Sequence, residues 1–360
     1  MDLVTILCGI SVVILAIYYY FTSTFGFWKS RGVRGPRPIP IFGTMKDVLL
    51  VKKSITEYMS ELYSTYKDEP LIGIFSQRTP LLVVNDPDLI KDVLIKDFTT
   101  FADRGMNYDE KANPLLLHLF NLESKRWRPL RTKLTPVFTS GKLKEMFHLI
   151  SECADHLEKY TDILTSQNKY VECRELTAKY TTDVIGSCAF GIEMNSLANE
   201  DAEFRKMGRS IFAPTWMNLI RFRLRDIVPK VYSFLTLIGI LPRPEHVSFF
   251  MRVIRETMDY REKNNIVRHD FVDMLLELKK QGNLSDISTH LLGRCNIFLH
   301  TRVCSRFGIY QTKIGLVKLL RNYKFETCKE TQIPYRINSK AVVLSPLGGI
   351  VLKITKIEKA

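Results

Sequence analysis

One tryptophan and one arginine, four residues apart, form the most chemically specific pair in the sequence. They are Trp127 and Arg131, within ESKRWRPLRTKLTPVF at residues 123–138. Pro129 has no N–H group to donate, so a helix here should begin only a few residues before it. Residues four apart share a helix face, and the unpaired N–H groups of the first turns favour anions. An indole N–H beside a guanidinium fork suits a carboxylate or a phosphate. A surface arginine that covers a buried tryptophan would give the same spacing.

Cysteine is the other residue type that could carry chemistry in this chain. Seven cysteines occur at irregular spacing and without a C-x-x-C pair, so a zinc ribbon is not expected. A reduced domain that faces the cytosol fits this pattern better than a secreted disulfide framework. Cys304 lies in RVCSRFGIYQTK at residues 302–313, at the start of an apolar, helix-like segment. It is a metal ligand, a core cysteine or the relic of a ligand that the chain has lost, and a structural position in the core is the default for a free cysteine.

The N-terminus has the composition of a membrane-spanning helix. Residues 3–21 carry no charge, and no charged residue follows until Lys29, so the run is long enough to cross a bilayer. Aromatic residues and then positive charges follow, as expected at an interface whose cytoplasmic side holds the rest of the chain. A cleaved signal peptide is the weaker alternative, because Asp2 is acidic and no small-x-small cleavage site follows. The run GPRPIPIFG at 35–43 reads as a stiff spacer.

Length and charge limit the classes of partner. The 360 residues suffice for one large domain or two ordinary ones, and 46% hydrophobic residues allow a sizeable core. The formal net charge of +14 suits an anionic membrane surface, an acidic protein or a nucleic acid, or simply a well-solvated surface. No nucleic-acid partner is expected, because no recognisable module supports one and a membrane span argues against it.

Residue periodicity predicts a mostly α-helical chain with a minor β part. A helix is expected over residues 46–67, then strands at 71–75 and 80–84, then a short helix from Pro87. A doubly wound parallel sheet is not expected, because strands and helices do not alternate regularly.

The rest of the chain should be helical until its C-terminus. Residues 140–285 have helical periodicity with breaks at 195–199, 214, 229 and 242–244. The β-branched run AVVLSPLGGIVLKITKI at 341–357 predicts a hairpin or paired strands.

Several short runs, taken in order, are similar to segments of one protein family. They are RGVRGPRPIPIFG at 31–43, FADRG at 101–105, WRPLR at 127–131, TTDVIGSCAFG at 181–191, DFVDMLLELKK at 270–280 and RFGIYQTKIGLVKLLRNYKFE at 306–326. Together they resemble the cytochromes P-450, the haem-thiolate monooxygenases, and most closely the microsomal insect type. The last run looks like the helix after the haem cysteine. The resemblance implies a mostly α fold with minor β (α+β), an incomplete P-450 fold behind an N-terminal transmembrane helix.

The same resemblance implies a cofactor, a site and partners. Trp127 and Arg131 would hold a propionate group of haem, Arg104 would reach the propionates as well, and SPLGG at 345–349 would line the substrate pocket. The implied activity is the oxidation of apolar small molecules, xenobiotic or lipid-like, with O2 and electrons from an NADPH-dependent flavoprotein reductase. The implied location is the endoplasmic reticulum membrane, with a single N-terminal span and the domain facing the cytosol.

The chain departs from the family pattern in its last third. It has no (Ala/Gly)-Gly-x-x-Thr pattern, no aromatic-x-x-Pro-x-Arg segment and no haem loop of the form F-x-x-G-x-x-x-C-x-G-x-R. The literal E-x-x-R match, Glu123 to Arg126, lies in the wrong place. The resemblance stops near residues 285–286 and resumes at Arg306. One contiguous internal block, from the oxygen-activating helix through the haem loop, therefore looks absent.

Cys304 is the candidate metal ligand, because it lies nearest to the position of the family's iron ligand. Its distance from Arg306 is two residues, where the family's pattern requires four. Each helical residue turns a side chain by about 100°, so a contraction of two residues swings the thiol well round the axis. A core cysteine is the alternative.

These observations predict five segments and leave two functions open. Residues 1–28 should be the anchor, 29–45 a basic, proline-rich hinge, 46–286 the N-terminal part of the P-450 domain, 287–305 an unmatched junction and 306–360 a C-terminal helix and β-hairpin. The chain is either a membrane-anchored haem monooxygenase or a catalytically inactive truncated isoform or pseudoenzyme that at most binds ligands or partners.

Overall fold

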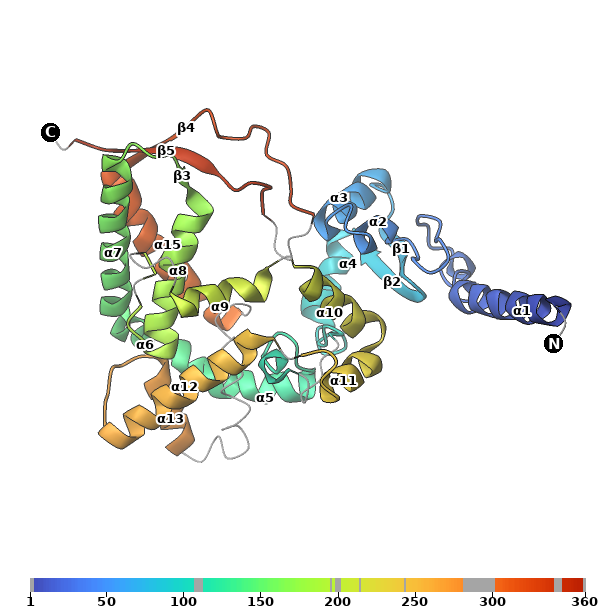
Figure 1. The fold of residues 1–360 in the computed structure, drawn as a ribbon, viewed down its shortest axis with the longest axis horizontal. Coiled ribbons are helices and arrows are strands. Elements are labelled where there is room, and N and C mark those ends of the chain that lie inside the picture. Colours follow the sequence, from blue (N-terminus) through green and yellow to red (C-terminus); the bar gives the residue numbers. More distant parts are fainter. Residues whose placement is uncertain are drawn as a thin grey trace. The chain divides into compact units, whose positions relative to one another are not determined.

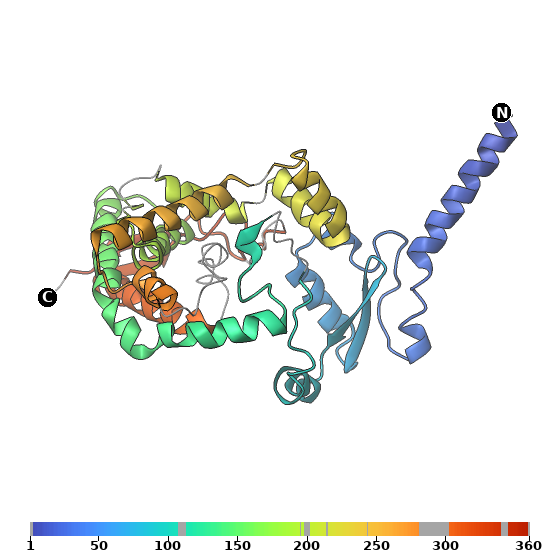
Figure 2. The same cartoon turned by 90° about the horizontal axis from the view of Figure 1, so that it is seen from below.

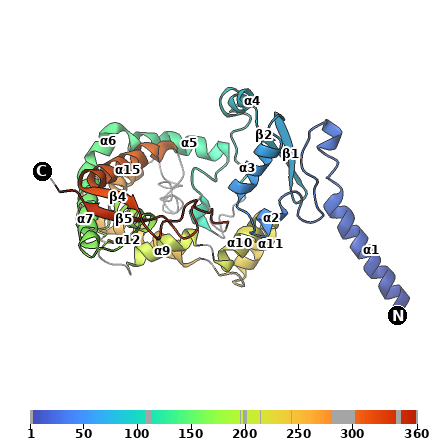
Figure 3. The ribbon, with the colours of Figure 1, turned by 90° about the horizontal axis from the view of Figure 1, so that it is seen from above.

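A computed structural model describes residues 3–106, 113–194, 196–197, 202–213, 215–242, 244–280, 302–339 and 345–358. The chain forms two units: residues 1–102 with 336–347, and residues 103–335 with 348–360. Figures 1, 2 and 3 show the ribbon from three sides. Helices predominate and strands are few, which confirms the predicted mostly α class with minor β.

The first unit begins with a long apolar helix, α1 (Leu3–Thr22). It has 20 residues, an 18-residue stretch of it reaches a mean hydropathy of 2.2, and none of its residues is buried. Among the residues the structure describes, it is the one helix long and apolar enough to cross a membrane. Its length and composition match those expected of the anchor.

A two-stranded hairpin forms the centre of the first unit. β1 (Leu71–Ser76) pairs antiparallel with β2 (Thr79–Val84), and α3 (Ile55–Thr65) packs on them through Leu62, which contacts Ile72 and Ile74. The helix α4 (Pro87–Lys91) follows and continues as a π-helical turn, η2 (Asp92–Lys96). A short 3₁₀ turn, η1 (Lys29–Arg31), precedes the hairpin. Both strands and the helix at Pro87 confirm the prediction.

The single helix expected over residues 46–67 is wrong, because the segment forms α2 (Lys46–Leu49) and α3 with a break between them. At the break the Ser54 side chain accepts a hydrogen bond from the Glu57 N–H at 3.1 Å, and the Glu57 carboxylate accepts one from the Ser54 N–H at 2.7 Å. This reciprocal capping box satisfies two N–H groups and starts a new helix. Val51 has φ 58°, a left-handed conformation that a continuous helix does not contain.

The second unit is mostly helical. Its first half holds η3 (Pro114–Leu116), α5 (Ser124–Leu134), η4 (Thr135–Phe138), α6 (Ser140–Glu145), α7 (Phe147–Ser166), α8 (Cys173–Ile185) and η5 (Gly186–Phe190). Its second half holds α9 (Glu203–Phe212), α10 (Trp216–Ile227), α11 (Pro229–Leu237), α12 (Glu245–Asn264), α13 (Phe271–Lys280) and α15 (Arg302–Asn322).

The helix breaks predicted at Pro229 and at 242–244 are confirmed, whereas Pro214 lies outside the described residues. Helix α9 ends at Phe212 and α10 begins at Trp216, Val228 separates α10 from α11, and α12 begins at Glu245. Pro229 is the first residue of α11, where its missing N–H costs nothing. Residues 191–194 and 196–197 are also non-helical, as predicted for the segment around 195–199, whose other positions lie outside the described residues.

A three-stranded antiparallel sheet joins distant parts of the second unit. β5 (Val351–Lys356) lies between β3 (Val171–Glu172) and β4 (Tyr323–Thr327). The paired strands predicted at the C-terminus are thus confirmed for β5, whereas residues 340–344 lie outside the described residues. The helix expected over 306–326 ends at Asn322, because Tyr323 and Phe325 alternate with polar residues and pair with β5.

Helix α15 packs against α7 and α8 (Figure 1). Side chains from all three helices link them. Lys318 forms an ion pair with Asp155 at 2.5 Å. Asn322 Nδ2 donates to the Glu158 carboxylate at 2.7 Å, and Tyr180 Oη donates to the Gln311 carbonyl at 2.9 Å. The C-terminal helix is therefore part of the same packed unit as the segment around α8.

Candidate functional site

Helix α5 carries the tryptophan and arginine that the sequence singles out. It begins at Ser124, five residues before Pro129, as the missing N–H of that proline predicts. Its buried face consists of Trp127, Leu130 and Leu134, which recur at the spacing of one helix face. Arg131, by contrast, is exposed. A buried tryptophan one turn before an exposed arginine fits both interpretations of the pair.

The Arg131 guanidinium carries a charge that no acidic side chain of the described residues offsets. Within the described part of the chain it makes no ion pair and no side-chain hydrogen bond. The neighbouring Arg128, which is also exposed, places its guanidinium 5.5 Å from the Trp127 ring. Among the described residues Arg131 is thus an exposed cation without an acidic partner, and it remains available for an anionic group.

The N-terminus of α5 is capped by a residue from outside the helix. Glu123 stands at the N-cap position and makes no side-chain capping bond. The Asp103 carboxylate instead accepts a hydrogen bond from the N–H of Ser124. Sequence reasoning missed Asp103, although it lies in the FADRG run, because a cap supplied from 21 residues away leaves no local pattern.

Arg104 lies beside the segment that leads into α5. Its guanidinium donates to the carbonyl of Phe120 at 3.3 Å and lies 4.9 Å from the Phe120 ring centroid. Through Asp103 the structure brings the FADRG run to the start of the helix that carries Trp127 and Arg131. Propionate binding by Arg104, Trp127 and Arg131 stays a prediction.

Cys304 is the third residue of α15, and its side chain lies outside the described residues. Its role as metal ligand therefore stays a prediction. Among the residues that are described, no group of three or more His, Cys, Asp or Glu side chains is arranged to hold a metal ion. The SPLGG segment forms a turn in which Gly348 and Gly349 have φ 82° and 79°; substrate contact there stays a prediction.

The cysteines whose side chains are described are free thiols. Burial raises the pKa of Cys153 to about 12 and that of Cys173 to about 11, and it raises the pKa of Cys188 as well. These thiols stay protonated at neutral pH, and a protonated thiol is a poor metal ligand and a poor nucleophile. Their role is packing.

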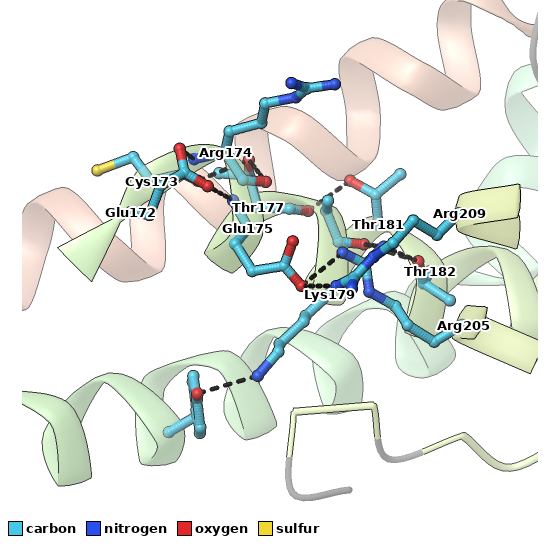
Figure 4. A network of polar contacts seen from close by, with 12 residues as sticks. Glu172, Cys173, Arg174, Glu175, Thr177, Lys179, Thr181, Thr182, Arg205 and Arg209 are labelled. Atoms are coloured by element: carbon cyan, nitrogen blue, oxygen red, sulfur yellow. Dashed lines mark hydrogen bonds and ion pairs between the residues drawn. The ribbon is translucent and has the colours of Figure 1, made fainter. Parts of the chain in front are cut away.

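A polar network between α8 and α9 fixes the second of these helices (Figure 4). Arg205, which is 8% exposed, donates to Glu175 at 2.8 Å and to Thr182 Oγ1 at 3.1 Å. Arg209 donates to the same Glu175 carboxylate at 2.5 Å. Partial burial opposes ionisation of Glu175, yet the bonds and charges of the two arginines hold its pKa below the ordinary value. Sequence reasoning missed this network.

A buried ion cluster joins two of the runs that carry the family resemblance. Arg261 is 3% exposed and Asp270 fully buried, and the two form paired hydrogen bonds of 2.7 and 2.5 Å. Asp273 accepts a third bond from Arg261 at 2.6 Å. Gly191 has φ 65°, and a Cβ there would lie 2.0 Å from the Arg261 guanidinium. Gly191, the last residue of TTDVIGSCAFG, therefore leaves room for the arginine that pairs with Asp270, the first residue of DFVDMLLELKK.

Comparison with known proteins identifies the family. The model of the cytochrome P-450 family matches residues 33–293, a range that includes Arg104, Trp127 and Arg131 but not Cys304. The chain belongs to the cytochrome P-450 family. This confirms the resemblance, and the cofactor of the family is haem. Residues 294–360 lie outside the matched range, so the resemblance of 306–326 to the helix after the haem cysteine stays a prediction.

Curated relatives are insect cytochromes P-450. Cytochrome P-450 6k1 of Blattella germanica is 37% identical over 277 residues, which cover 77% of this chain and 52% of the relative. Cytochrome P-450 6A1 of Musca domestica is 41% identical over 275 residues, which cover 76% of this chain and 53% of the relative. Cytochrome P-450 6a2 of Drosophila melanogaster is 35% identical over 291 residues, 79% of this chain and 56% of the relative. The chain spans about half the length of the curated relatives it matches.

Proposed function

We propose that this P-450 chain is a membrane-anchored haem monooxygenase that inserts an oxygen atom into apolar small molecules. The observation that carries this proposal is the exposed Arg131 guanidinium on α5, one turn after Trp127 and inside the family-matched range. This guanidinium has no acidic partner among the described residues. A planar guanidinium fork forms bidentate hydrogen bonds with a carboxylate, and a haem propionate is a carboxylate. These residues therefore fit one edge of the cofactor.

The residues of this chain would bind and orient the cofactor. Arg131 would pair with a propionate, Trp127 would pack beside it, and Arg104 would add positive charge from the segment before α5. Asp103 would hold the start of α5 in place through Ser124. When bound, haem supplies the binding and activation of O2. Electrons would come from an NADPH-dependent flavoprotein reductase, whose acidic surface would suit the net positive charge of this chain.

We further propose that α1 anchors the chain in the endoplasmic reticulum membrane with the two folded units in the cytosol. The length and hydropathy of α1 support a single span. The basic residues that follow it, Lys29, Arg31, Arg34 and Arg37, support the cytosolic orientation. An alkaline wash of membranes that carry the full chain tests the anchor, since an integral protein stays in the pellet.

A second candidate is a non-catalytic chain that binds the membrane and a ligand. Two observations favour it: the chain spans about half the length of its curated relatives, and Cys304 stands within α15 without the family's glycine and spacing. Helices that lose their partners expose apolar surface, as Leu316, Val317 and Leu320 of α15 do. Such a chain should hold haem weakly.

The spectrum of the carbon monoxide complex separates the two candidates. The full chain is purified in lipid nanodiscs with added haem, and its reduced carbonyl spectrum is compared with that of Cys304→Ser. Stoichiometric haem with a thiolate-type spectrum that Cys304→Ser abolishes supports the monooxygenase. Bound haem without a thiolate signature supports the non-catalytic chain. Failure to bind haem at all refutes the cofactor proposal.

A further inference from the structure

The end of α1 is bonded to a turn that lies 54 residues further along the chain. Thr24 Oγ1 donates to the Arg78 carbonyl at 2.7 Å. The Arg78 guanidinium lies 3.6 Å from the ring centroid of Tyr20, in the last turn of α1, and also reaches Ser23 Oγ at 3.4 Å. Arg78 belongs to the turn between β1 and β2, and Figures 1 and 2 show this end of the hairpin beside the end of α1.

The chain between α1 and the hairpin adds further contacts. The Trp28 indole N–H donates to the Ile74 carbonyl at 2.9 Å, and the ring centroids of Phe25 and Phe75 are 5.4 Å apart. Gly73 lies under Trp28, because a Cβ at that position would be 2.4 Å from the indole. These contacts hold the helix and the hairpin as one packed element. A flexible tether between them would make few such contacts or none.

Three cations of this element have no acidic partner among the residues that the structure describes. Lys29, Arg31 and Arg78 make no ion pair with any residue that the structure describes. The sequence contains no Asp or Glu between Asp2 and Asp47. The Arg31 guanidinium packs 3.6 Å from the ring centroid of Phe27, as that of Arg78 does on Tyr20. Unpaired cations beside aromatic rings at the end of an apolar helix match the chemistry of a lipid headgroup layer.

We propose that the Gln77–Thr79 turn is a second membrane contact, in which Arg78 binds lipid phosphate groups beside Tyr20. The proposal rests on the proposed anchoring by α1. The hairpin stands with its turn toward the bilayer and with Leu71 and Val84 at the far end. The anchor and the hairpin then move as one body, and α1 sets the orientation of the first unit at the membrane surface.

Lipid is the favoured occupant because of where the cations lie. Arg78 and Tyr20 share the level at which the apolar helix ends, which is the level of the phosphate groups when the helix spans. An acidic protein would have to enter the headgroup layer to reach Arg78. The sequence alone does not reveal this contact, because Arg78 lies far outside the basic run at residues 29–37.

The depth of the hairpin in the membrane tests the proposal. The full chain, with the exposed Cys8 replaced by serine, carries a fluorophore at Thr79→Cys or at Asp68→Cys and is reconstituted in phosphatidylcholine vesicles that contain phosphatidylserine. The two positions lie at opposite ends of the hairpin, roughly 20 Å apart at a rise of about 3.4 Å per residue. A quencher attached to lipid headgroups should quench the label at 79 and leave the label at 68 nearly unaffected.

Charge reversal tests the role of Arg78 itself. Arg78→Glu should reduce the quenching at position 79, whereas Lys67→Glu, the same charge change at the far end of the hairpin, should not. Alkaline extraction of the same vesicles reports the anchor separately: protein lost from the pellet refutes the span. Equal quenching at 79 and 68 in retained protein overturns the membrane contact. Two results overturn the lipid site of Arg78. One is unchanged quenching in Arg78→Glu. The other is a label at position 79 that lipid does not quench and that an added acidic protein shields.

Discussion

The Asp103 carboxylate accepts a hydrogen bond from the N–H of Ser124, the first residue of α5. The N-cap residue of this helix makes no capping bond of its own, so Asp103 satisfies one of the free N–H groups. A carboxylate at this end also interacts favourably with the helix dipole. Asp103 of the FADRG run therefore supports the helix that carries the WRPLR run.

Replacement of Asp103 should weaken α5. Asp103→Ala removes the cap and should lower the free energy of unfolding by about 1 kcal/mol, the usual cost of a lost N-cap. Asp103→Asn keeps an acceptor oxygen and should lose less. Urea unfolding followed by circular dichroism measures the change. Lys125→Ala, at an exposed position in the same turn, is the control, and equal stability of the Lys125→Ala and Asp103→Ala proteins would contradict the capping role.

Replacement of Arg131 should weaken haem binding without unfolding the protein. Arg131 is exposed and unpaired within the described residues, so its loss leaves no buried group without a partner. A hydrogen-bonded charge pair contributes about 1.5–3 kcal/mol, so Arg131→Ala should reduce haem affinity roughly tenfold or more. Haem titration followed by absorbance measures it. Arg128→Ala removes the same charge from the neighbouring exposed position, and an equal loss of affinity there would show that Arg131 has no specific role.

The Arg261 cluster should be essential for stability. Arg261→Ala leaves the fully buried Asp270 carboxylate without its cation, and such a loss costs about 3–5 kcal/mol. Arg261→Met combined with Asp270→Asn removes both charges and should recover part of the loss. Lys263→Ala, exposed on the same helix, should be neutral. Denaturant unfolding compares the variants, and an Arg261→Ala protein as stable as Lys263→Ala would refute the role of the cluster.

The elements that are readable from the sequence are those set by local chemistry. The strands of the hairpin follow from two short apolar runs joined by a turn. The helix that begins at Pro87 and the start of α5 before Pro129 follow from proline alone. The break before α3 was also readable, because Ser54 and Glu57 form the S-x-x-E pattern of a capping box. Helical periodicity on both sides of the break obscured it.

The elements that are not readable depend on contacts between distant segments. Asp103 caps a helix that begins 21 residues later, and Arg78 stacks on a tyrosine of α1. Gly191 has a left-handed backbone conformation and no side chain, and the Arg261 guanidinium occupies the space that a Cβ would fill. In each case one partner is an ordinary polar residue or glycine, and the sequence around it contains no periodic or capping signal. The family resemblance identified the FADRG, WRPLR, TTDVIGSCAFG and DFVDMLLELKK runs. It did not give the physical reason that they occur together.

Asp183 on α8 is a buried carboxylate with an incomplete set of partners. Its Oδ1 accepts a hydrogen bond from the Ser196 N–H at 2.8 Å, and its Oδ2 has no hydrogen-bond partner among the described residues. Burial disfavours the charged form and raises the pKa of Asp183 above its ordinary value of 3.8, although the bonds from Ser196 act in the opposite direction.

The raised pKa of Asp183 predicts a loss of stability as the pH rises. Between the ordinary pKa and the raised one, the folded protein binds more protons than the unfolded chain, so the free energy of unfolding falls with increasing pH and levels off above the raised pKa. Asp183→Asn removes this titration. The stability of Asp183→Asn relative to the parent should therefore increase from about pH 4 toward neutral pH, because ionisation then penalises the parent alone. Urea unfolding at several pH values measures the difference, and Glu152→Gln, at an exposed position of the same unit, should show none. A difference that stays constant or decreases as the pH rises would show that burial does not raise the pKa of Asp183.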